Sequence, residues 1–200
     1  MSYDIYLKER VSGDTIMLPV KHVMIGGTYQ ADYDHVTKTF SPAAIREAWL
    51  NITYNYGRYY YEAAENDERF YGDDDGKIDN LGIRGIYGKT GAESISMLKD
   101  IAKRIENKYK KDGEWIKTVR KETVYKDEKG NVVDSIDAIF SNIKVAEKEE
   151  IEFELSEGPN TDYWQDTAAN AIKPIFQLIA MAELRPDGIW EGDWYEGKTT

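Results

Sequence analysis

The sequence has no cysteine and only two histidines among its 200 residues. Without cysteine the chain forms no disulfide and no thiolate metal site, which suits a reducing compartment. No run approaches the roughly 20 apolar residues that a membrane-spanning helix needs. The first residues lack the basic start and the apolar segment of a signal peptide. We therefore expect a cytoplasmic protein that has no membrane partner.

Motifs of common enzyme classes are also missing. The sequence contains no H-E-x-x-H, P-loop, G-x-G-x-x-G or G-x-S-x-G pattern. His22 and His35 are the two side chains whose ordinary pKa lies near neutrality, and neither belongs to a motif. Asp187, Glu191 and Asp193 form a carboxylate cluster of a kind that can do acid–base or metal chemistry, although acidic residues often follow a turn. We expect no catalytic residue, no metal and no cofactor.

Basic residues are few but concentrated. The net charge of −11 argues against general affinity for nucleic acid, because phosphate contacts need Lys and Arg. Residues 99–121 nevertheless hold nine Lys or Arg against four acids. This run is either a solvated helix face and loop or a basic patch that contacts a partner, nucleic acid included. The candidate contact residues are Lys103, Arg104, Lys108, Lys110, Lys111, Lys117 and Arg120.

Acidic residues gather in two stretches, 62–79 and 147–157. The segment 73–79 looks like a calcium-binding loop, but with Gly76 at the sixth position Tyr71 and Gly82 fall where the end ligands belong. We interpret both stretches as solvated acidic surface able to attract a basic partner. The candidate contact residues are Asp73, Asp74, Asp75, Asp79, Glu149 and Glu150.

Two main helices are predicted. Thr90 and Glu93 form a capping box that starts a helix over about 91–109. Asp166 and Thr167 are suitable N-caps for a second helix over about 166–184, although Pro174 interrupts its hydrogen bonding. The sequence 185–188, Arg-Pro-Asp-Gly, then fits a type I turn.

Strands account for much of the rest. Residues 3–7 and 15–18 suggest an opening hairpin, and 49–56 is the strongest predicted strand, while residues 41–44 suit a short helical turn. Residues 114–157 contain strand-like segments on both sides of a turn sequence at 127–131, and they predict an inserted β-hairpin block. We expect one α+β domain over 1–200, with an antiparallel sheet packed by the two helices and the hairpin subdomain inserted.

Four segments resemble a known family. They are 2–7 (SYDIYL), 49–57 (WLNITYNYG), 83–95 (IRGIYGKTGAESI) and 185–193 (RPDGIWEGD). Together they are similar to small uncharacterised proteins of phages and prophages of Firmicutes, a family that brings no established catalytic residues. The extra polar and acidic residues at 31–46, 62–80 and 114–157 depart from the usual pattern. The family-signature residues considered as a surface are Trp49, Asn51, Tyr54, Asn55, Arg185, Asp187, Trp190 and Asp193.

Three functions follow as expectations. The resemblance and the acidity imply an inhibitor of host defence in the host cytoplasm, most specifically an anti-CRISPR protein similar to those that act on type II-A Cas9, whose nucleic-acid channel is positively charged. The second is a phage module that binds a nucleotide or other small ligand in a pocket lined by Trp49, Asn51, Tyr54 or Asn55 with Arg185. The third is a hydrolase using two carboxylates among Asp187, Glu191 and Asp193. The sequence does not specify the oligomeric state.

Overall fold

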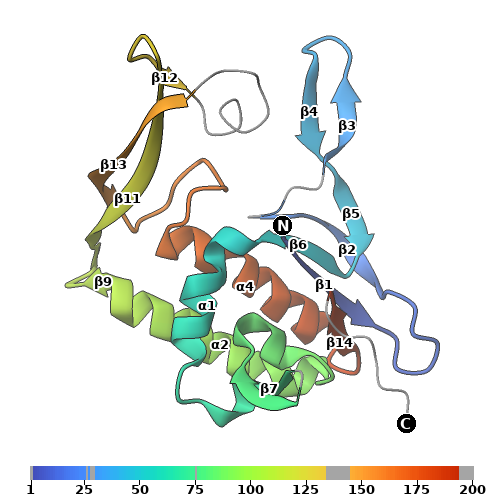
Figure 1. Ribbon diagram of the computed structural model, residues 1–200. Coiled ribbons are helices and arrows are strands. Elements are labelled where there is room, and N and C mark those ends of the chain that lie inside the picture. Colours follow the sequence, from blue (N-terminus) through green and yellow to red (C-terminus); the bar gives the residue numbers. More distant parts are fainter. Residues whose placement is uncertain (1, 26, 28–29, 75, 134–144, 194–200) are drawn as a thin grey trace. The chain divides into compact units, whose positions relative to one another are not determined.

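The computed structural model describes residues 2–193 apart from 26, 28–29, 75 and 134–144 (Figure 1). The chain divides into two compact units, one formed by Met1–Glu114 with Gly158–Thr200 and the other by Trp115–Glu157. Each unit is described by itself. The structure is α+β with antiparallel strand pairing throughout the described residues, as the sequence predicts.

The first unit contains three α-helices, three 3-10 helices and several short strand pairs among its described residues. In chain order they are β1 (Ser2–Lys8), β2 (Met17–Val23), β3 (Gln30–Asp34), β4 (Thr39–Pro42), β5 (Ala44–Glu47), β6 (Trp49–Thr53), η1 (Tyr54–Tyr56), α1 (Gly57–Ala64), η2 (Glu68–Phe70), β7 (Tyr71–Asp74), β8 (Lys77–Asn80), η3 (Gly82–Ile86), α2 (Gly91–Tyr109), β9 (Lys110–Lys111), α4 (Ala168–Leu184) and β14 (Ile189–Gly192). The short strand β10 (Glu114–Trp115) pairs with β9.

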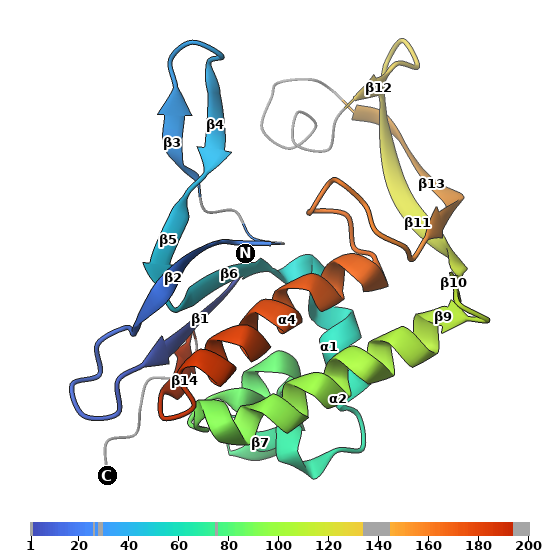
Figure 2. The same cartoon turned by 180° about the vertical axis from the view of Figure 1, so that it is seen from behind.

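The helices α2 and α4 lie side by side in both views (Figures 1 and 2). At the start of α2, the Glu93 amide donates to Thr90 Oγ1 at 3.2 Å and the Thr90 amide donates to Glu93 Oε2 at 2.8 Å, which completes the predicted capping box. Thr167 caps α4 by accepting from the Asn170 amide at 3.3 Å. Both predicted helices are thus confirmed, and Pro174 lies inside α4 without ending it.

The three-stranded sheet has the order β14–β1–β6, so the first strand of the chain is its centre. Ile5 lies opposite Gly192 on one side and Leu50 on the other. Alternation along β1 buries Tyr3, Ile5 and Leu7 in the core and leaves the intervening polar residues half-buried on the outer face. The outer face of this sheet therefore carries Ser2, Asp4, Tyr6 and Lys8.

One local prediction holds in part and two are wrong. The opening hairpin is formed at its turn, where the Ile16 amide donates to the Leu7 carbonyl oxygen at 2.9 Å and an antiparallel bridge joins Lys8 to Thr15, while the rest of β1 pairs with β6 and β14. Residues 41–44, expected as a helical turn, belong to strands β4 and β5. The strand expected over 49–56 ends at Thr53, where Thr53 Oγ1 accepts from the Asn55 amide at 3.3 Å and a 3-10 turn begins. At 41–44, pairing of β4 with β3 and of β5 with β2 replaces the local preference, whereas at Thr53 a local side-chain hydrogen bond ends the strand.

The second unit is a twisted ribbon of β11 (Lys117–Asp127) and β13 (Val145–Ser156), with β12 (Val132–Val133) beside β11. Opposed residues share a face, so one face carries Lys121 against Glu152 and the other carries Glu122 against Ile151. At its base the buried carboxylate of Glu157 accepts from Thr118 Oγ1 at 2.6 Å and from the guanidinium of Arg120. The expected inserted block, about 114–157, and this unit cover nearly the same residues.

Within the described part of the chain, every helix is too short or too polar to cross a membrane.

Candidate interaction surfaces

Two family-signature residues lie on the outer face of the sheet. Asn51 Nδ2 donates to Asp4 Oδ1 at 2.8 Å and to Ser2 Oγ at 2.6 Å, and Trp49 Nε1 donates to the same Asp4 oxygen at 3.3 Å. The Trp49 ring is stacked on Tyr6, with centroids 5.8 Å apart and planes 5° apart. Trp49 and Asn51 therefore form part of an ordered sheet face whose polar groups are hydrogen-bonded to one another.

Two more signature residues, Tyr54 and Asp193, meet at a polar cluster completed by Arg84 and Tyr87. Arg84 Nη2 lies 2.9 Å from Asp193 Oδ2, which also accepts from Tyr54 OH at 2.6 Å, and Tyr87 OH donates to Asp193 Oδ1 at 3.0 Å. The Arg84 guanidinium also lies over the Tyr3 ring, 4.6 Å from its centroid. We call these four polar residues the Arg84 cluster.

Burial and hydrogen bonding oppose each other in the Arg84 cluster. Burial alone raises the pKa of the Asp193 carboxyl, but hydrogen bonds from Arg84 and Tyr54 outweigh it and lower that pKa. Burial raises the pKa of the Tyr87 hydroxyl, and the neighbouring Asp193 carboxylate raises it further. Asp193 is therefore a stable carboxylate and both tyrosines are hydrogen-bond donors, an arrangement that anchors the strand β14.

The sequence reasoning missed Arg84 and Tyr87. Both belong to the segment 83–95, which carries the family resemblance, so their place in that segment could have marked them as candidates. Nothing local connects them to Asp193, which lies 109 residues from Arg84 along the chain. Backbone hydrogen bonds of Gly88 and Lys89 with Trp190, at 2.8 and 3.0 Å, bring the segment of Arg84 and Tyr87 to the end of β14.

The remaining signature residues lie elsewhere in the first unit. Arg185 forms ion pairs with Glu9 at 2.9 Å and with Asp187 at 2.8 Å, so it lies apart from the groups of Trp49 and Asn51. Trp190 is wholly buried in the core, where its Nε1 donates to Ser94 Oγ at 2.7 Å.

The last signature residue, Asn55, is exposed, and its Nδ2 donates to the carbonyl oxygen of Trp164 at 2.7 Å. The described contacts thus hold Asn55 and Arg185 on different partners and do not join them at one site.

The carboxylate cluster expected at residues 187–193 is dispersed into separate ion pairs. Besides the pairs of Asp187 with Arg185 and of Asp193 with Arg84, Glu191 pairs with Lys8 at 2.7 Å. Each carboxylate thus has its own cation, and the three do not converge on a shared cleft. A two-carboxylate hydrolytic site finds no geometric support here.

Most of the candidate basic residues are paired with carboxylates. On α2, Lys108 lies 2.8 Å from Glu62 and Arg104 lies 2.8 Å from Asp67. The other pairs are Lys110 with Glu106, Lys117 with Glu154 and Arg120 with Glu157. Lys103 and Lys111 are exposed and have no ion pair among the described residues.

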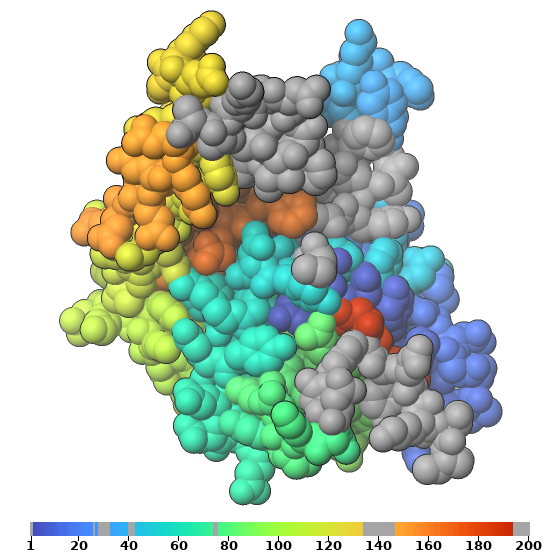
Figure 3. Space-filling model, in the orientation of Figure 1, coloured from blue at the N-terminus to red at the C-terminus, as the bar shows by residue number. Residues whose placement is uncertain are grey.

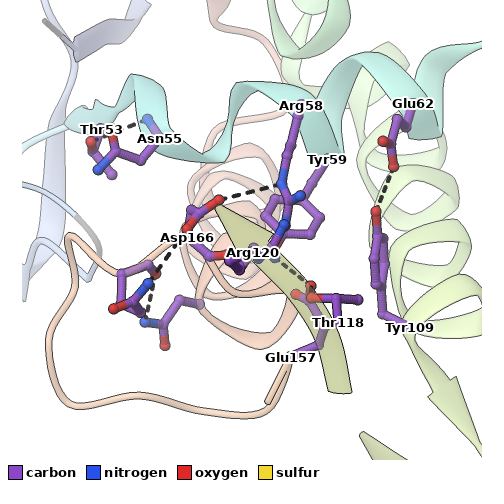
Figure 4. Close-up of polar contacts among 12 residues, drawn as sticks. Thr53, Asn55, Arg58, Tyr59, Glu62, Tyr109, Thr118, Arg120, Glu157 and Asp166 are labelled. Carbon is purple, nitrogen blue, oxygen red and sulfur yellow. Dashed lines mark hydrogen bonds and ion pairs between the residues drawn. The ribbon is translucent and has the colours of Figure 1, made fainter. Parts of the chain in front are cut away.

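Arg104 and Lys108 also line a shallow pocket of about 210 Å³ between α1 and α2, together with Tyr59, Glu62 and Tyr109. Tyr109 OH donates to Glu62 Oε2 at 2.6 Å (Figure 4). Within this pocket Lys108 and Tyr109 are thus engaged with Glu62, while Arg104 is engaged with Asp67. They are arranged to hold α1 against α2 and offer little to a ligand.

The Asp67 carboxylate is held by two arginines. Its oxygens accept from Arg69 Nε at 2.9 Å and from Arg69 Nη2 at 2.6 Å, and Arg104 Nη2 adds a third contact at 2.8 Å. Hydrogen bonds from Arg69 hold the pKa of the Asp67 carboxyl well below its usual range, although burial opposes them.

Stability should therefore depend on Asp67 in acid. A depressed folded-state pKa adds stability above the unfolded value of about 3.9, and this stability is lost as the pH falls towards the folded value. Asp67→Asn should be less stable than the parent at pH 7, and the difference should narrow as the pH falls from about 4 towards 2. Urea unfolding across this range measures it, with the exposed Asp79→Asn as control. A difference that stays constant with pH would contradict the prediction.

The acidic candidates of the first unit lie on the hairpin β7–β8. Asp73 Oδ1 accepts from the Gly76 amide at 2.7 Å and so shapes the turn, while Asp79 is exposed beside Asn80. Asp75 and the side chain of Asp74 lie outside the described residues. No group of three metal-ligating side chains is found in the described ranges.

The acidic candidates of the second unit lie on β13. Glu149 pairs with Lys126 at 2.5 Å, and Glu150 lies 3.9 Å from Lys121. The strand carries three further glutamates, and five of its twelve residues are therefore acidic: Glu147, Glu149, Glu150, Glu152 and Glu154. The strand β13 is therefore strongly acidic, whereas β11 opposite it carries four basic residues, Lys117, Arg120, Lys121 and Lys126.

Comparison of the chain with protein-family models, with curated proteins and with solved structures finds no match.

Proposed function

We propose that this protein is a phage-encoded inhibitor that acts by binding a host defence protein, and that type II-A Cas9 is its target. The resemblance of the four segments suggests the phage origin and the class of target. The observation that carries the proposal is the acidic strand β13, which presents alternating glutamates to solvent. A positively charged nucleic-acid channel is the complementary surface.

The ion pairs of the first unit support a binding role over a catalytic one. Asp187, Glu191 and Asp193 are each held by a separate cation, so none is placed to exchange a proton with a substrate. Binding through solvated charge requires no such group, because long-range attraction acts mainly on the association rate.

Immobilised full-length protein should capture type II-A Cas9 from solution, and the association rate should fall as salt rises. Exposed charges are screened over about 10 Å at 0.1 M ionic strength, so the attraction weakens steeply. Replacing Glu149, Glu150, Glu152 and Glu154 by lysine should slow association by at least tenfold, which is within the range of electrostatic steering of about 10 to 1,000. Surface plasmon resonance measures the association rate of the parent at several salt concentrations and that of the lysine variant.

The matched control reverses charge in the other sense. Lys103→Glu with Lys111→Glu makes the protein more acidic, so association with guide-free Cas9 should not slow. Slower association with guide-loaded Cas9 alone would place these two lysines against the RNA. Absence of capture with and without guide, or equal inhibition of DNA cleavage by all variants, would overturn the proposal.

A further inference from the structure

The strand β13 forms an open edge of the second unit. Within the described residues it is hydrogen-bonded to β11 on one side only, in the order β12–β11–β13. The outer side of an edge strand presents unpaired backbone amides and carbonyls at alternate residues. Figure 3 shows β13, in orange, exposed on the face in view. The edge can therefore accept a further strand.

The two faces of β13 differ in chemistry. Glu150, Glu152 and Glu154 lie on one face, with side chains 61 to 67% exposed. Ile151 and Phe153 lie on the other face beside Glu149, and each is 37% exposed. A strand added at this edge would thus meet a row of carboxylates on one face and a pair of apolar side chains next to Glu149 on the other.

The carboxylates are only loosely held by their own ribbon. The cross-strand distances are 3.3 Å from Lys121 to Glu152, 3.9 Å from Lys121 to Glu150 and 3.5 Å from Lys117 to Glu154. Two lysines thus serve three glutamates, all well exposed. Exposed pairs of this kind are weak, at about 0 to 1 kcal/mol, so the glutamates remain able to bind a second set of cations.

We propose that the β13 edge binds an extended segment of a partner protein in which basic and apolar residues alternate, adding it to the ribbon as a further strand. The basic residues would face the glutamates, and the apolar residues would extend the row of Ile151 and Phe153. A second copy of this chain does not fit, because antiparallel pairing of two β13 strands sets glutamates against glutamates. The inference rests on the proposed binding function and names the chemistry of the partner segment.

The test uses a fluorescent peptide of alternating Lys and Val, about ten residues long so that it spans most of β13 at about 3.3 Å per residue. Fluorescence anisotropy with the full-length protein should show binding. A Lys–Pro repeat of equal length and charge should bind at least about tenfold more weakly, since proline gives no amide to a sheet. Equal binding of the two peptides would mean charge adsorption alone and would overturn the proposal.

Variants locate the site. Reversing Glu150, Glu152 and Glu154 to lysine should weaken Lys–Val binding by at least about tenfold, or 1.4 kcal/mol. The matched control is Asp73→Lys with Asp79→Lys on the hairpin β7–β8. It should change the affinity for the Lys–Val peptide less than about twofold, since exposed substitutions away from the site change stability little. Circular dichroism checks that both fold. Equal loss in the two variants would overturn the assignment to β13.

Hydrogen exchange tests the same site in the protein without substitutions. Hydrogen exchange of amides in 147–155 should slow when the Lys–Val peptide is added, while exchange in β7–β8 should not change. Unchanged exchange in β13, or a dimer held through β13 in sedimentation, would contradict the inference. The peptide assay contains no Cas9, so its failure and the failure of the proposed target are separable.

Discussion

Replacing Trp190 by alanine should lower the free energy of unfolding by about 3 to 5 kcal/mol, the usual cost of removing a buried tryptophan. The Trp190 side chain is wholly buried, and its ring links the last strand of the sheet to the start of α2 through the bond from Nε1 to Ser94 Oγ. Alanine leaves a cavity and deprives Ser94, itself fully buried, of this donor. Urea unfolding followed by circular dichroism measures the loss.

A second tryptophan provides the control. Trp164 is 46% exposed, so Trp164→Ala should cost well under half as much. Ser94→Ala is made both in the parent and together with Trp190→Ala. This double-mutant cycle separates the free energy of the hydrogen bond from that of the packing of the ring. Equal destabilisation by the two tryptophan changes would show that the core does not depend on β14.

Arg84→Ala should lower the free energy of unfolding by about 2 to 3 kcal/mol. The side chains of Arg84 and Asp193 are 15% and 16% exposed, and removing one partner leaves the other charge largely buried. Breaking a fully buried pair costs about 3 to 5 kcal/mol. A smaller loss is expected here because the hydroxyls of Tyr54 and Tyr87 still donate to Asp193.

Lys8→Ala is the matched control on the same sheet. It breaks the pair with Glu191, whose members are 28% and 35% exposed, and should cost no more than about 1 kcal/mol. Arg84→Lys keeps the charge but loses the planar guanidinium, whose Nη2 donates to both Tyr54 and Asp193, so its effect should fall between those of Arg84→Ala and Lys8→Ala. Thermal unfolding ranks all three. Equal effects of Arg84→Ala and Lys8→Ala would mean that the Arg84 cluster adds no stability beyond a surface pair.

Features decided within a few residues could be predicted from the sequence. The capping box of Thr90 and Glu93 placed the start of α2, because both of its hydrogen bonds join residues three apart. Thr167 placed the start of α4 in the same way. The α+β class followed from the separation of these helices from the alternating strands.

The pairing in the sheet β14–β1–β6 could not be predicted, because it depends on contacts between distant segments. Residues 2–8 had a plausible local partner, yet Ile5 pairs with Leu50 and Gly192. The same limit applied to the candidate sites. Tyr54 and Asp193 were selected separately, and only the folded sheet joins them through Arg84.

The central place of β1 fixes the order in which the protein can be completed on the ribosome. Its second neighbour in the sheet is β14, and the first amides of α2 depend on the same end of the chain, with Gly91 donating to Gly188 at 2.8 Å and Ala92 to Pro186 at 3.0 Å. Neither the sheet nor the start of α2 can be finished before residue 192 has been translated. The first unit must therefore acquire its native form after synthesis of nearly all of this sequence, while the ribbon of residues 115–157 has all its strands available earlier.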